Sequence, residues 1–62
     1  MWIKIGNKLI NTDRVNHIEI FQENTSPVQA NVRIWWNNNH FLDVRSENIA
    51  DDLFVPLMNK DQ

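Results

Sequence analysis

The chain has 62 residues, a net charge of −2 and no cysteine. This length allows one domain at most, with a small core that usually needs a disulfide, a metal or a partner chain as reinforcement. The lack of cysteine excludes disulfides and thiolate metal sites, so we expect self-association into a homodimer or a larger assembly. The charge also lacks the basic excess that nucleic-acid-binding proteins usually carry.

The chain contains no apolar run of the roughly 18 residues that a membrane span requires. Its first residues also lack the long apolar stretch behind a basic start that is typical of a signal peptide. We therefore expect a soluble, cytoplasmic protein with no membrane partner.

A β-hairpin is predicted at the start of the chain. Gly6 and Asn7 lie between the apolar runs 2–5 and 8–10. Because glycine adopts the positive φ that a tight hairpin turn needs, these two runs should pair. Residues 11–14 (NTDR) then favour a turn or a short 3₁₀ segment, since Asn, Thr and Asp side chains bond to nearby backbone groups.

Three further strands are predicted at residues 15–21, 28–36 and 40–45, separated by a polar loop at 22–27 and an asparagine turn at 37–39. The strand at 28–36 alternates most clearly. Its inward face carries Ala30, Val32, Ile34 and Trp36, and its other face carries Asn31, Arg33 and Trp35.

A short helix should follow Ser46, whose side chain is suited to an N-cap. Ile49, Ala50, Leu53 and Phe54 fall on one apolar stripe of that helix. Because proline cannot continue a helix, Pro56 should end it near residue 54 or 55. Residues 55–58 are then expected to pack in extended form, and residues 59–62 to form a loose tail.

The fold class that these elements predict is β-rich (α+β), with a small antiparallel five-stranded meander and one short C-terminal helix. Residues 1–58 should form this single domain. Its core side is expected to comprise Ile3, Ile5, Ile18, Ile20, Val32, Ile34, Leu42 and Val44, together with Trp36 and Phe54.

Four aromatic residues fall in the opposite phase of the strands: Trp2, Phe21, Trp35 and Phe41. The solvent-facing side of a one-layer sheet is normally polar, so large rings on that side indicate an interface. The alternative is that the rings cover one another as cross-strand pairs with polar neighbours around them.

No motif for catalysis, a cofactor or a phosphate is present, so we expect no enzyme and no cofactor. The carboxylates considered for acid–base chemistry are those of Glu19, Asp43, Asp51 and Asp52, and the hydroxyls considered as nucleophiles are those of Ser26 and Ser46. A solvated helix face explains Asp51 and Asp52, while loop and cap positions explain the serines. His17, Glu19 and His40 lack the spacing of a known metal motif, so no metal is expected.

Basic residues interleaved with aromatic ones can bind single-stranded nucleic acid. Lys4, Arg33 and Arg45 share the outer side with the rings, which makes them the possible nucleic-acid contacts. The alternative is that their long side chains cover the exposed rings.

Residues 10–19 (INTDRVNHIE) resemble the segment L-N-P-D-x-I-x-x-I-E of the small flagellar FlbD/SwrD proteins, with Thr12 at the position of the family's proline. The resemblance also extends loosely to the later order of strand, turn, strand and helix. It implies an accessory protein of motility that acts by contact and not by catalysis.

Residues 32–34 (VRI) and 44–49 (VRSENI) resemble the spacing of two segments in the CsrA family of RNA-binding translational regulators. That resemblance implies a strand-exchanged dimer with a short C-terminal helix. The family's RNA-contacting arginine position holds Ser46 here, with Arg45 one place earlier.

Two functional hypotheses follow: a non-catalytic protein-contact and self-association module, and, as the alternative, an RNA-binding regulator. Convergence of Lys4, Arg33 and Arg45 on one exposed groove favours RNA. Ion pairs between these cations and Glu19 or Asp43 around the rings favour protein contact.

Overall fold

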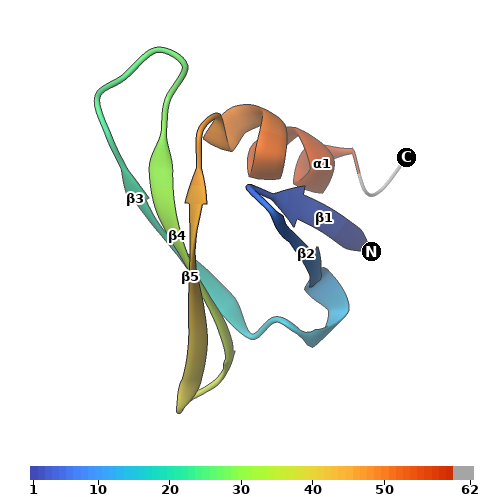
Figure 1. Ribbon diagram of the computed structural model, residues 1–62. Coiled ribbons are helices and arrows are strands. Elements are labelled where there is room, and N and C mark those ends of the chain that lie inside the picture. Colours follow the sequence, from blue (N-terminus) through green and yellow to red (C-terminus); the bar gives the residue numbers. More distant parts are fainter. Residues whose placement is uncertain (60–62) are drawn as a thin grey trace.

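The computed structural model describes residues 1–59 of the chain (Figure 1). Two antiparallel sheets contain the strands: β1 (Trp2–Ile5) pairs with β2 (Lys8–Asn11), and β4 (Ala30–Asn37) lies between β3 (His17–Gln22) and β5 (His40–Ser46). The remaining elements are the 3₁₀ turn η1 (Thr12–Arg14), the π-helical turn η2 (Ala50–Phe54) and the helix α1 (Val55–Met58). No helix in residues 1–59 is long and apolar enough to cross a membrane.

The β-rich fold with five antiparallel strands and a short C-terminal helix is therefore confirmed, but the single continuous sheet is wrong. The chain leaves the β1–β2 hairpin through η1, where Asn11 Oδ1 accepts a hydrogen bond from the Asp13 backbone N–H at 3.1 Å. Asn16 N–H then donates to the Trp35 carbonyl at 2.7 Å, so the next strand is directed onto β4 and not onto β2.

The β1–β2 turn is the predicted one. Gly6 has a φ of +59°, which matches the first central position of a type II′ turn. The turn also lies close against β5, since a Cβ atom at Gly6 would come 2.8 Å from the Arg45 carbonyl oxygen. Glycine is thus required here both for its conformation and for the approach of the hairpin to the larger sheet.

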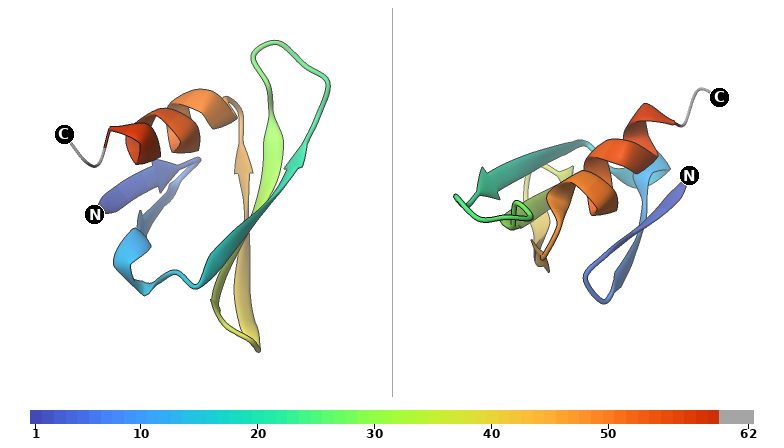
Figure 2. Two further views of the ribbon diagram at one scale, coloured as in Figure 1. Left: turned by 180° about the vertical axis from the view of Figure 1, so that it is seen from behind. Right: turned by 90° about the horizontal axis from the view of Figure 1, so that it is seen from above.

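The hairpin and the helix lie on the same side of the three-stranded sheet, so the molecule has two layers (Figures 1 and 2). The core between them consists of Ile3, Ile5, Ile10, Ala30, Val32, Ile34, Val44, Ile49 and Leu53. Four further residues are partly buried against it: Ile18, Ile20, Leu42 and Phe54. The predicted inward phase is therefore confirmed for β3 and β5, and for β4 as far as Ile34.

Trp36 departs from this phase and is 37% exposed, so its assignment to the core is wrong. The register of β4 and β5 shifts between Trp35 and Asn37, where a bulge interrupts the alternation of side chains. A period of two extrapolated through the bulge therefore predicts a burial of Trp36 that the structure does not have.

The start of the helix also differs from the prediction. Ser46 is the fully buried last residue of β5, and its hydroxyl donates to Asp52 Oδ2 at 2.7 Å. Asn48 provides the cap, because its Oδ1 accepts a hydrogen bond from the Asp51 backbone N–H at 3.2 Å and its carbonyl accepts the first helical bond from Asp52.

Pro56 does not end the helix, so the extended conformation expected for residues 55–58 is wrong as well. The turn before it is π-helical, and the Val55 N–H bonds to the Ala50 carbonyl, five residues back. Such a turn is wider than an α-turn, which relieves the clash between a proline ring and the preceding turn. Of the predicted loose tail, residues 60–62 lie outside the described residues.

Candidate contact surface

The side of the three-stranded sheet that faces away from the hairpin and the helix is called the outer face here. Strand register arranges its residues in three rows across β3, β4 and β5: His17–Trp35–Phe41, Glu19–Arg33–Asp43 and Phe21–Asn31–Arg45. Three of the four aromatic residues predicted for the contact surface, Phe21, Trp35 and Phe41, thus share one face.

Trp35 is the centre of the aromatic row. The His17 ring stacks on it with a centroid distance of 5.5 Å and an interplanar angle of 14°, and the Phe41 ring lies 4.7 Å away at 45°. The indole Nε1–H donates to Glu19 Oε1 at 2.6 Å. These contacts hold the half-buried Trp35 ring in one orientation, while Phe41 is still 46% exposed.

Arg33 occupies the centre of the next row. Its Nε and Nη2 donate to the two Asp43 oxygens at 2.9 and 3.2 Å, and its guanidinium carbon lies 4.3 Å from the centroid of Phe41. The hydrogen bonds from Arg33 hold the pKa of the Asp43 carboxyl below its ordinary value, despite some opposing desolvation. The same bonds raise the pKa of Arg33. Arg33 is therefore engaged by a carboxylate and a ring within the chain itself.

Arg45 joins the end of β5 to the loop between β3 and β4. Its two terminal nitrogens bind both oxygens of Glu23, and Nη2 also donates to Gln29 Oε1 at 2.7 Å. Glu47 Oε1 lies 3.6 Å from its Nε. Hydrogen bonds from Arg45 lower the pKa of Glu23, so the guanidinium acts as a clamp across the base of the loop.

The structure separates the other predicted residues from this surface. Trp2 and Lys4 lie on β1 in the two-stranded sheet, and Trp2 is 66% exposed there. Among residues 1–59, no ring contact joins Trp2 to the outer face. The cations considered for nucleic acid are therefore divided between two sheets, and the two arginines are paired with carboxylates.

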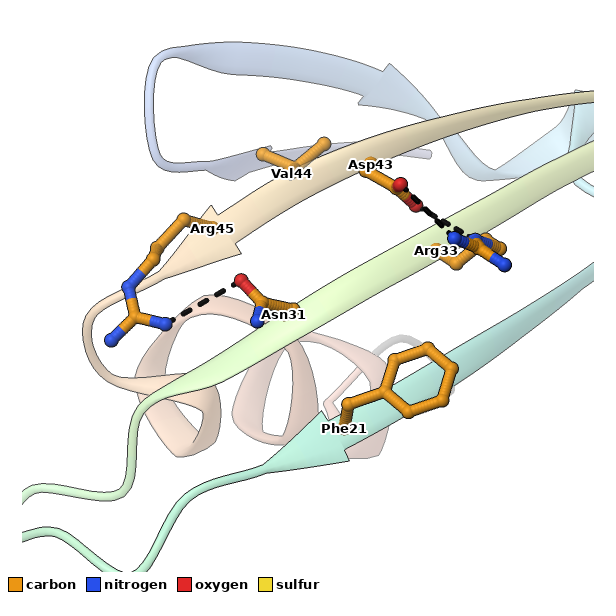
Figure 3. A pocket seen from close by; sticks show the side chains of 6 residues that line it. All are labelled: Phe21, Asn31, Arg33, Asp43, Val44 and Arg45. Carbon is orange, nitrogen blue, oxygen red and sulfur yellow. Dashed lines mark hydrogen bonds and ion pairs between the residues drawn. The ribbon is translucent and has the colours of Figure 1, made fainter.

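An open pocket of about 650 Å³ lies on the outer face. Its lining consists of Phe21, Asn31, Arg33, Asp43, Val44 and Arg45 (Figure 3). Arg33 and Arg45 lie at opposite ends of it, with Asn31 between them (Figure 3). Pockets for small ligands usually enclose most of the ligand, so this open depression is better suited to a surface contact.

The two histidines considered for metal binding have other partners. His40 Nδ1 lies 3.0 Å from Asn37 Oδ1 in the β4–β5 turn, and His17 stacks on Trp35. Within the part of the chain that the structure describes, no three His, Cys, Asp or Glu residues are grouped to hold a metal.

Sequence reasoning did not identify the Arg45 clamp or the bond from Trp35 to Glu19. The second follows from the register: Glu19 and Trp35 are diagonal neighbours once β3 and β4 are paired. The clamp depends on the path of the loop, for which the sequence provides no periodic signal.

No family model matches the chain, and neither a curated protein nor a solved structure is significantly similar to it. Both resemblances seen in the sequence therefore stay predictions.

Proposed function

We propose that this protein is a small non-catalytic contact module, and that the outer face is its contact surface. The observation that carries the proposal is the ordered cluster around Trp35, in which one half-buried indole is held by His17, Phe41 and Glu19 on a solvent-facing sheet. Rigid aromatic groups of this kind supply contact area at low entropic cost and are frequent anchors of protein interfaces.

Protein is favoured over nucleic acid as the class of partner. Arg33 and Arg45 are bound to Asp43 and Glu23, and Lys4 lies on the other sheet. Affinity for nucleic acid depends on cations that are available to phosphates. An RNA phosphate at either arginine would therefore lie close to the carboxylate that the arginine already binds.

The proposal includes two occupants of the outer face: a second copy of the chain and a segment of another protein. The second copy is considered because the buried core within residues 1–59 is small, with nine apolar residues. The other protein is considered because Phe41 beside Trp35, and Phe21 two rows away on the same face, are about half exposed.

The test compares the wild type with Trp35→Ala, using Trp2→Ala as the matched control because Trp2 lies on the other sheet. Sedimentation equilibrium at micromolar concentration measures self-association, and fluorescence anisotropy measures binding to short basic, acidic and neutral peptides. Removal of an anchoring tryptophan typically costs about 2 kcal/mol or more, which is roughly thirtyfold in affinity. Trp35→Ala should lose the contact that the wild type makes, whereas Trp2→Ala should keep it.

Trp35→Phe is the second variant, because it keeps a ring in the cluster and loses only the bond to Glu19. The circular dichroism spectrum of Trp35→Phe is compared with that of the wild type, and shows whether the sheet stays folded in a variant whose contact is weakened. A wild type that makes no contact in either measurement contradicts the proposal, as does a Trp35→Ala variant that makes the wild-type contact.

A further inference from the structure

The outer face and its margin carry more negative than positive side chains. Four carboxylates lie there, those of Glu19, Glu23, Asp43 and Glu47, against the guanidinium groups of Arg33 and Arg45. This surface therefore has a formal charge of −2, equal to the net charge of the whole chain. The other ionisable side chains in the sequence balance one another.

Two of these carboxylates are incompletely neutralised. Among residues 1–59, Glu19 takes part in no ion pair, and its only side-chain hydrogen bond is from the neutral Trp35 indole. Glu47 is 70% exposed and approaches Arg45 only at 3.6 Å. The surface thus combines exposed rings with carboxylates that are available to an incoming cation.

Arg33 shows how a cation is bound on this surface. It places its guanidinium 4.3 Å from the centroid of Phe41 while forming a two-pronged ion pair with Asp43. A ring face and an adjacent carboxylate together provide a favourable environment for Lys or Arg. The Trp35 ring and Glu19 offer the same pair of groups to a partner, in the same two rows but on β4 and β3.

The spacing of the rows favours an extended partner. The aromatic row and the carboxylate row are two residues apart along each strand, which corresponds to about 6.7 Å. In an extended segment that runs along the strands, alternate side chains on one side repeat at the same distance. One side chain then reaches the rings while the next on that side reaches Glu19.

We infer that the outer face binds an extended, positively charged polypeptide segment, which places apolar groups on the Trp35–Phe41 rings and Lys or Arg beside Glu19. The inference rests on the proposed function. A second copy is the weaker occupant, because it would oppose one face of charge −2 to another. Nucleic acid is weaker still, since its phosphates would meet the same carboxylates.

The test uses a short capped peptide in which Lys and Val alternate, with matched peptides that carry Glu or Gln in place of Lys, and a uridine oligonucleotide. Binding to the full chain is measured by titration at low and at tenfold higher salt concentration. The Lys–Val peptide should bind most tightly, and higher salt should weaken it because the contact is partly ionic.

Glu19→Gln removes one negative charge and keeps an oxygen that can accept the Trp35 hydrogen bond. Loss of one exposed ionic contact should weaken the Lys–Val peptide about two- to fivefold. Asp51→Asn is the matched control, since it removes the same charge from the exposed side of η2 and should leave the affinity unchanged.

Each further outcome overturns a defined part of the account. Equal or tighter binding of the Glu–Val peptide, or an affinity unaffected by Glu19→Gln, overturns the basic partner and leaves the contact module standing if Trp35→Ala still weakens binding. Self-association that depends on Trp35, without binding of any peptide, likewise overturns the basic partner and leaves the contact module standing. Tight binding of the oligonucleotide, or no contact at all, overturns both proposals.

Discussion

At the residue scale, Trp35 and Arg33 have similar surroundings, because each side chain contacts a phenylalanine ring and a carboxylate. Trp35 is a large ring held by a histidine, a phenylalanine and a carboxylate, and Arg33 is a cation held by a phenylalanine and a carboxylate. The rings therefore cover one another in part, as cross-strand pairing predicts, and are also partly exposed. The cross-strand contacts between the rings are thus present, and the proposal of a contact surface concerns the part of the rings that stays exposed.

The structure predicts a clear loss of stability when Gly6 is replaced. An alanine there must adopt a φ near +59° and bring its Cβ to 2.8 Å from the Arg45 carbonyl oxygen. Gly6→Ala should lower the free energy of unfolding by at least about 1 kcal/mol, as measured by urea denaturation. Asn7→Ala in the same turn is the control, because Asn7 has no positive φ. Equal stability of Gly6→Ala and the wild type would mean that the hairpin does not approach β5 as described.

The ion pairs predict how stability depends on pH. Arg45 holds the pKa of Glu23 below its ordinary value of 4.5, and Arg33 holds that of Asp43 below 3.8. Because both are lowered in the folded state, their contribution is present above the ordinary values and is lost as pH falls through the folded ones. Urea unfolding should therefore show declining stability from about pH 5 downwards.

Glu23→Gln isolates one of these pairs. The variant should be less stable than the wild type at neutral pH, and the difference should shrink in acid, where Glu23 itself becomes protonated. A difference that stays constant down to the lowest pH would show that the Arg45–Glu23 pair contributes no charge-dependent stability.

At the element scale, the periodic parts of the fold follow from the sequence and the interruptions do not. The alternation in β4 correctly predicts the burial of Ala30, Val32 and Ile34, because side chains on a strand alternate strictly. It does not predict the exposure of Trp36, since a bulge adds one residue to a strand without a marked change in the amino-acid composition of that strand. Similarly, Pro56 indicates a helix end only if the preceding turn is α-helical, and here it is a π-turn.

The candidate site follows the same pattern. The shared face of Arg33 and Trp35 is predicted by the alternation within β4, and Phe41 joins them once the Asn37–Asn39 turn fixes the register of β5. Trp2 is placed elsewhere because the sheet divides at η1, where the Asn16 N–H bonds to the Trp35 carbonyl and β3 begins its pairing with β4. Such a bond has no signature in the pattern of apolar residues.

The helix start offers a test of the cap assignment. Asn48→Ala should lower the free energy of unfolding by about 1 kcal/mol, because it removes the acceptor of the Asp51 N–H. Asn48→Asp keeps that acceptor and should stay close to the wild type in thermal or urea unfolding. If Asn48→Ala has wild-type stability, the cap assignment is wrong.

At the scale of the whole molecule, one small core supports two layers. Ile34 is fully buried at the centre of the three-stranded sheet, opposite Ile18 and Leu42. Ile34→Val should cost about 1 kcal/mol, which is a large fraction of the stability of so small a domain. Leu9→Ala removes more atoms from a side chain that is 69% exposed, and should change the free energy of unfolding by less than about 0.5 kcal/mol. A reversed order of these two effects would contradict the arrangement of the layers.

The indole N–H signals of the three tryptophans test the central claim most directly, because Trp2, Trp35 and Trp36 lie in three different environments. They are followed in a two-dimensional NMR spectrum of the full chain while the protein concentration, and then the concentration of the Lys–Val peptide, is raised. We predict that the Trp35 signal shifts or broadens while the Trp2 signal stays in place. A Trp2 signal that moves while Trp35 does not, or three unchanged signals in both series, would contradict the outer face as the contact surface.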